Sequence, residues 1–150
     1  MTKQQFDTIK QPRLMVLNLL EKFTLEQINA IPAGFNNNIA WNLGHMLAAQ
    51  LGICYKRAGL EVDESFYQTY KPESKPEGPI TQEQFDEIKE KLISSLDQLE
   101  KDHQAGIFVN YPTWSTRYGV VISSIDDAIS FLPFHEGLHI GYIMAIRKLV

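Results

Sequence analysis

The chain has 150 residues, 44% of them hydrophobic and 21% charged, which is typical of a soluble globular protein with one domain over residues 1–150. Its net charge is −4 and its lysines and arginines do not cluster, so a nucleic-acid partner is disfavoured, because neutralising phosphates requires a basic surface. We expect no membrane partner, since no apolar run could span a bilayer, and no export, since the polar N-terminus lacks a signal core. The lone cysteine, Cys54, cannot form an internal disulfide and favours a cytoplasmic location.

The chain begins with a periodic apolar segment. Apolar side chains recur at helical spacing from about Phe6 to Phe23, with one polar interruption at Arg13. Pro12 lies inside this pattern, so the predicted helix either kinks there or properly starts just before it. Thr24 and Gln27 then form a capping-box pattern, which predicts a short helical turn.

A second long helix is predicted after the break in the chain near residues 32–38. Asn38 is a suitable N-cap, and the apolar pattern runs from Ile39 to about Arg57. Gly59 provides a C-terminal stop. Residues 60–80 contain several prolines and charges, and we expect a long loop with little regular structure.

Thr81 and Gln84 form a second capping-box pattern and predict a third helix that ends near Lys101 or His103. The pattern then changes, because residues 106–122 are rich in β-branched and aromatic side chains. We expect either an extended crossover or a short β-hairpin, with FVNYP and YGVVI as its arms.

The last predicted element is a fourth helix that runs to the C-terminus. Ser124 and Asp127 form a third capping-box pattern at its start. Pro133 lies within it and should either kink the helix or mark a restart. Four helices with two long connections predict an all-α four-helix bundle rather than a sheet architecture.

The histidines carry the clearest functional signal. His135 and His139 lie four residues apart on the fourth helix, so both imidazoles face one side and can bind one metal ion. His45, inside the second long helix, is the candidate third ligand, whereas His103 is explained by the helix dipole at its C-terminal end. Three imidazoles would leave a coordination position open for water or substrate. Such a pair also arises by chance on amphipathic helices, so spacing alone leaves a structural interpretation open.

Two segments resemble the DinB/YfiT-like superfamily of four-helix bundles. NNIAWNLGHMLAAQ contains the second-helix histidine and HEGLHIGY contains the fourth-helix pair, and the overall length, helix order and long middle loop also resemble this family. The resemblance implies a divalent metal, nickel or zinc first and iron or manganese as alternatives, bound by His45, His135 and His139. Leu138 and Tyr142 stand where many members carry a second histidine and a glutamine, which puts substrate contacts of those family residues in question.

The resemblance further implies a metal-dependent enzyme, either a thiol-dependent S-transferase or isomerase, or a hydrolase. Its substrate would be a small molecule, with a low-molecular-weight thiol as a candidate partner. Glu136 could act as a general base, although a solvated helix carboxylate is the simpler interpretation. The alternatives are a non-catalytic, metal-stabilised dimeric binding module and a carrier that uses an apolar cavity. Gly137 and Gly141 form a bare stripe where a second subunit could pack, so a homodimer is expected.

Five further residues have competing interpretations. Asn42 could orient a ligand or merely contribute to a polar helix face. Trp41 and Tyr142 could wall a metal pocket or pack in the core, and core packing is the commoner role of aromatic residues. Cys54 is predicted on the opposite side of its helix and is not expected to be a fourth ligand. Arg117 could bind an anionic substrate group, but nothing in the sequence places it near the histidines.

Overall fold

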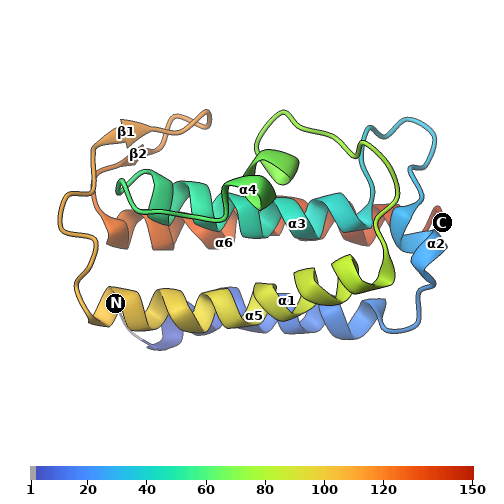
Figure 1. Ribbon diagram of the computed structural model, residues 1–150, viewed down its shortest axis with the longest axis horizontal. Helices are drawn as coiled ribbons and strands as arrows, with labels where there is room; N and C mark the ends of the chain where they lie inside the picture. The colour runs from blue at the N-terminus through green and yellow to red at the C-terminus, as the bar shows by residue number, and fades with distance from the viewer. Residues whose placement is uncertain (1–2) are drawn as a thin grey trace.

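The computed structural model describes residues 3–150, and four long helices dominate this part of the chain. They lie in two layers (Figure 1), with α3 and α6 in one layer and α1 and α5 in the other. Contacts also join α3 to α5 and α1 to α6, so each long helix packs against two others. The long helices are α1 (Lys3–Leu20), α3 (Ile39–Gln50), α5 (Gln82–Gln104) and α6 (Ile125–Ile146). The predicted all-α bundle is confirmed.

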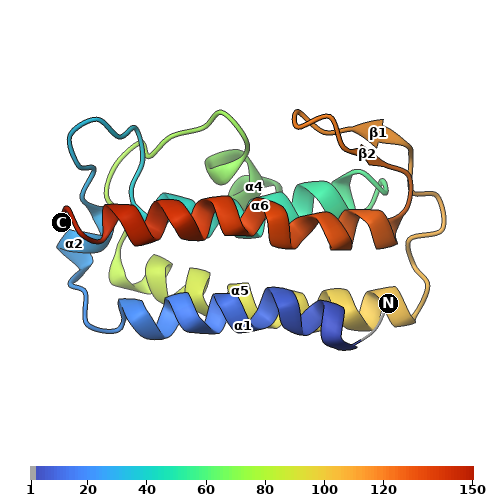
Figure 2. The ribbon, with the colours of Figure 1, turned by 180° about the vertical axis from the view of Figure 1, so that it is seen from behind.

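The four long helices run in two opposite directions. In Figures 1 and 2, α3 and α5 run in the same direction, opposite to α1 and α6. Helices α1 and α3 run antiparallel and are joined by residues 21–38, which contain α2 (Leu25–Asn29). The parallel pair α3 and α5 requires a crossover along the bundle. That crossover contains α4 (Glu64–Tyr70), which lies over α3 (Figure 1).

Local hydrogen bonds explain where the helices begin. The predicted capping boxes before α2 and α5 are both present with their reciprocal bonds. The Asn38 side chain caps α3 by accepting a 2.8 Å hydrogen bond from the backbone N–H of Trp41. At the start of α6, Ser124 accepts from the Asp127 N–H, but the Asp127 carboxylate accepts from the N–H of Ser123 rather than that of Ser124. The third capping box therefore keeps its first hydrogen bond, but the second goes to the residue before the N-cap.

The crossover and the second long helix differ from the sequence-based expectation. The α-helical pattern of α3 ends at Gln50 and continues as a π-helical segment, η1 (Leu51–Lys56), where an α-helix to Arg57 was expected. The expected loop over residues 60–80 contains α4, whose N-cap is Asp63. Helix α4 escapes prediction because it spans only two turns and packs its aromatic side chains against α3.

Neither proline in the long helices ends its helix. Helix α1 continues through Pro12 and α6 continues through Pro133, so no restart occurs at residue 133. Between α5 and α6, β1 (Trp114–Ser115) pairs antiparallel with β2 (Val121–Ile122), with Trp114 opposite Ile122. The predicted hairpin is confirmed, but its first arm begins after FVNYP. Within residues 3–150, no helix combines the length and the apolarity that crossing a membrane would require.

Candidate metal centre

Three histidines meet where α3 packs against α6. His45 projects from α3, and His135 and His139 project from α6. One ring nitrogen from each lies within 4.8 Å of the other two, a spacing at which a single ion could contact all three. The structure therefore brings together the three residues that were selected from the sequence. Sequence spacing does not relate His45 to the other two histidines, because only the packing of α3 against α6 places His45 opposite them.

The His45 ring is fixed by the backbone of α4. Its Nδ1 lies 2.6 Å from the carbonyl oxygen of Tyr70. A carbonyl oxygen only accepts hydrogen bonds, so Nδ1 carries the proton and Nε2 retains its lone pair. Gly44 permits this approach, because a Cβ at that position would overlap the Tyr70 ring. On its other side the His45 ring stacks on Trp41, with centroids 4.7 Å apart and planes inclined by 10°.

His139 is oriented in the same way by a side chain. Its Nδ1 lies 2.9 Å from Oδ1 of Asn42. The Asn42 amide nitrogen donates to the side chain of Asn37 and to the carbonyl of Asn38, at 2.9 and 2.8 Å, so its oxygen must face the histidine. The His139 Nδ1 therefore donates and its Nε2 retains a lone pair. Of the two interpretations of Asn42, the structure favours the one in which it orients a ligand.

His135 lacks such a partner. Its Nδ1 is buried without a hydrogen-bond partner among the described residues. A buried polar atom of this kind is costly unless another group satisfies it, so an unpaired imidazole nitrogen beside two other imidazoles fits the binding of an additional group. The donor set is chemically suited to a divalent transition metal.

The three imidazoles are held in the neutral state that metal binding requires. Burial lowers the pKa of His45, and the positive charge of Arg117 lowers it further. Burial also lowers the pKa of His135 to about 4 and that of His139 to about 3, and the neighbouring histidines contribute in the same direction. At neutral pH each ring therefore has a lone pair available for a ligand bond.

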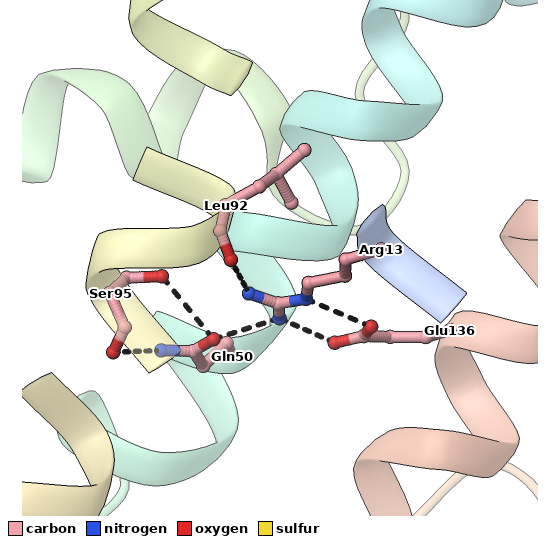
Figure 3. Close-up of polar contacts among 5 residues, drawn as sticks. All are labelled: Arg13, Gln50, Leu92, Ser95 and Glu136. Carbon is pink, nitrogen blue, oxygen red and sulfur yellow. Dashed lines mark hydrogen bonds and ion pairs between the residues drawn. The ribbon is translucent and has the colours of Figure 1, made fainter. Parts of the chain in front are cut away.

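Glu136 belongs to a different polar network, which is buried among the four long helices (Figure 3). Its two carboxylate oxygens accept hydrogen bonds of 2.5 and 3.0 Å from the guanidinium of Arg13 on α1. Arg13 also donates to the side-chain oxygen of Gln50 on α3 and to the carbonyl of Leu92 on α5. The expectation of a solvated carboxylate was wrong, because Glu136 is only 2% exposed. With both oxygens bound by Arg13, the geometry favours a structural role over that of a general base.

The remaining histidine and the cysteine lie outside the cluster. His103 Nε2 lies 2.5 Å from the carboxylate of Asp126, so this ring joins α5 to the start of α6. Cys54 is fully buried, and burial raises the pKa of its thiol, which keeps it protonated. Tyr142 is half exposed and packs edge-on against Phe35 rather than forming a wall of the cluster.

A cavity of about 170 Å³ opens beside the cluster. His45, His135 and Arg117, in the loop of the β-hairpin, are among its lining residues. The sequence alone did not place Arg117 near the histidines, but the hairpin folds over η1 and the start of α6 (Figure 1) and brings it to the same cavity. Sequence reasoning missed two other residues, Arg13 and Arg57. The only signal for Arg13 was a charged residue at an apolar position of its helix.

Comparisons with known proteins agree with this geometry. A family model described as the DinB superfamily matches residues 8–143. No curated protein matches the chain. The match begins in α1 and ends in α6, so it covers all four long helices and the three clustered histidines. The family and the histidine cluster together fit a metal-binding protein. The chain belongs to the DinB superfamily.

Proposed function

We propose that this protein is a metal-dependent enzyme whose divalent ion is bound by His45, His135 and His139. The observation that carries the proposal is that the histidine cluster borders a cavity instead of being enclosed by the core. A structural metal site is normally closed by four protein ligands, whereas a catalytic site has three and an open position. The cluster found in residues 3–150 has three side chains that could bind an ion, the number that a catalytic site uses.

Residues of this chain orient the histidines and keep them neutral. The Tyr70 carbonyl and the Asn42 side chain hold two of the imidazoles with Nε2 available, and the buried surroundings keep all three rings neutral. Nickel or zinc suits such an all-imidazole donor set, with iron or manganese as alternatives. A bound ion would supply Lewis acidity, which lowers the pKa of a water or thiol at the open position.

The reaction class that we propose is a thiol-dependent S-transferase, or alternatively a hydrolase, because a bound ion could activate either a thiol or a water. In the first case the partner would be a low-molecular-weight thiol and the substrate a small electrophile. The cavity supports a small-molecule substrate, because aromatic and aliphatic side chains form much of its wall.

Elemental analysis of the purified protein tests the metal site directly. The native protein should contain about one equivalent of nickel or zinc, and His139→Ala should lose most of it. His103→Ala is the matched control, because His103 lies outside the cluster and should leave the metal content unchanged. Equal metal content in the native protein and in His139→Ala would refute the site. Activity assays then separate the two reaction classes. Turnover of a thiol with an electrophile would indicate a transferase, and turnover of an ester would indicate a hydrolase.

A second candidate is a non-catalytic dimeric module that the metal stabilises. The outer face of α6 supports it, since Phe134, Leu138 and Tyr142 are 40–51% exposed and follow helical spacing. Gly137 and Gly141 on the same helix have open space where a Cβ would stand, so another helix could approach closely. Light scattering with and without metal distinguishes the two candidates. A metal-dependent dimer without turnover on any substrate panel would favour the module.

A further inference from the structure

The cavity beside the histidine cluster carries an excess of positive charge. Arg57, which follows η1, and Arg117, in the loop between β1 and β2, both line it. No aspartate or glutamate is among its lining residues, although the whole chain has a net charge of −4. Within residues 3–150 neither arginine forms an ion pair with a carboxylate. Guanidinium groups without a carboxylate partner are the groups that proteins commonly use to bind carboxylates and phosphates.

Both arginines are positioned by contacts around the hairpin. The guanidinium carbon of Arg57 lies 4.2 Å from the centroid of the Trp114 ring, a cation–π arrangement. Trp114 is held in turn by Tyr111, which accepts from its indole N–H at 3.1 Å and donates to the carbonyl of Ile53 in η1 at 2.6 Å. The hairpin is therefore anchored to the wall of the cavity.

Arg117 is placed by the tight turn of the hairpin. The backbone N–H of Thr116 donates to the Val120 carbonyl at 2.8 Å, and Gly119 adopts a positive φ of 78° that favours glycine. Arg117 lines the same cavity as His45 and His135, and its positive charge helps to lower the pKa of both histidines. An anion at this end of the cavity would therefore lie beside the histidine cluster.

The rest of the cavity wall is largely apolar, and the cavity is small. Ala48, Ala49, Ile53 and Phe131 contribute apolar surface, and Tyr67 and Trp114 add aromatic rings. The cavity volume of about 170 Å³ is close to the roughly 150 Å³ of a protein cavity that accommodates benzene. A ligand with about one ring or a short alkyl chain would fill it.

We propose that this cavity binds a small organic anion, with its carboxylate or phosphate at Arg57 and Arg117 and its apolar body against the aromatic wall. The inference rests on the proposed function, because it takes this cavity as the substrate site and assigns the substrate's chemical class. A negatively charged group at the arginines would hold the molecule in the cavity that His45 and His135 also line, where the reaction would occur.

Fluorine NMR titration of the full chain, as purified with its metal, tests the proposal. The probes are 4-fluorobenzoate, 4-fluorophenylphosphonate and the neutral isostere 4-fluorobenzamide. At least one anion should bind at least tenfold more tightly than the amide, because charge-assisted hydrogen bonds are stronger than neutral ones. A preference for the benzoate would indicate a carboxylate ligand, and a preference for the phosphonate would indicate a phosphate ligand. Equal affinities for the three probes, or no binding by any of them, would overturn the proposal.

Substitutions assign the preference to the arginines. Arg117→Gln and Arg57→Gln should each weaken anion binding about tenfold and leave the affinity for the amide unchanged. Both side chains are exposed, so the fold should persist, and circular dichroism checks this. Arg117→Lys, which keeps the charge, should recover part of the affinity. Lys148→Gln is the matched control, because it removes the same charge from an exposed residue outside the cavity. Unchanged anion affinity in both arginine variants would contradict the assignment.

The same titration on metal-free protein and on His139→Ala separates this proposal from the proposed function. His139 does not line the cavity, so the anion preference should survive in both samples. If the preference disappears when the metal is removed, the ion binds the anion and the arginine site is wrong, although the metal centre stands. If no metal binds but the preference remains, the metal-dependent enzyme is wrong and the anion site stands.

Discussion

Replacing one partner of the buried Arg13–Glu136 pair should destabilise the bundle strongly. Both side chains are inaccessible to solvent, with exposed fractions of 0 and 3%, and the pair joins α1 to α6. Glu136→Gln retains the shape of the side chain but leaves the Arg13 guanidinium without a countercharge. Arg13→Met leaves the Glu136 carboxylate unpaired and removes a donor to Gln50. In either variant an uncompensated charge remains in the core.

The size of the effect follows from burial. Removing one member of a buried ion pair typically costs about 3–5 kcal/mol. The total stability of a domain is about 5–15 kcal/mol, so either variant should lose a large fraction of it. A domain of this size changes its melting temperature by about 2–4 °C per kcal/mol, so we expect a decrease of about 6–20 °C. The double variant Arg13→Met/Glu136→Leu removes both charges and should recover most of this loss.

Urea denaturation followed by circular dichroism measures these differences, and a double-mutant cycle isolates the coupling energy. The control is Asp97→Asn, which breaks the exposed Lys10–Asp97 pair between α1 and α5 and should cost about 1 kcal/mol or less. Single-variant costs as small as this control, or a double variant that merely sums the two single costs, would refute the reasoning. Folded Glu136→Gln should still bind metal, because the carboxylate is not part of the histidine cluster.

Three further outcomes are expected. Gly44→Ala should displace Tyr70 and lower metal affinity about 10–100-fold by isothermal titration calorimetry, whereas Gly137→Ala, which has open space around it, should leave affinity unchanged. Asn42→Ala should weaken metal binding by a similar factor of about 10–100 because His139 loses its acceptor, and Asn42→Asp should retain most of the affinity. Metal-free protein should lose stability as the pH falls from 6.5 towards 4, by up to ~1.4 kcal/mol per pH unit for each histidine of α6. Their pKa values in the folded state are lowered to about 4 and 3 from 6.5, so the unfolded chain takes up protons first as the pH falls. Urea denaturation at successive pH values measures the free energy of unfolding. A free energy that does not change between pH 6.5 and 4 would contradict this prediction.

Much of the fold could be predicted because its signals are local. Helical periodicity and the caps at Asn38, Thr24 and Thr81 indicated where helices begin, since each cap binds a backbone N–H within its own first turn. Helix α4 was missed for the complementary reason. Its two turns are too short to be stable alone, and its close packing depends on Gly44 of α3 and Gly52 of η1, which lie earlier in the sequence.

For the candidate site, too, the relations set by local spacing could be predicted and the contacts between distant segments could not. The sequence by itself determined that His135 and His139 share one face of a helix, because the helical repeat alone sets that relation. Only the tertiary structure decided that His45 joins them, that Glu136 pairs with Arg13 inside the core, and that Arg117 reaches the cavity. Each of these depends on which helices pack against each other and on where the hairpin folds. Such contacts between distant segments are chosen by burial and packing of the whole chain, and no local spacing encodes them.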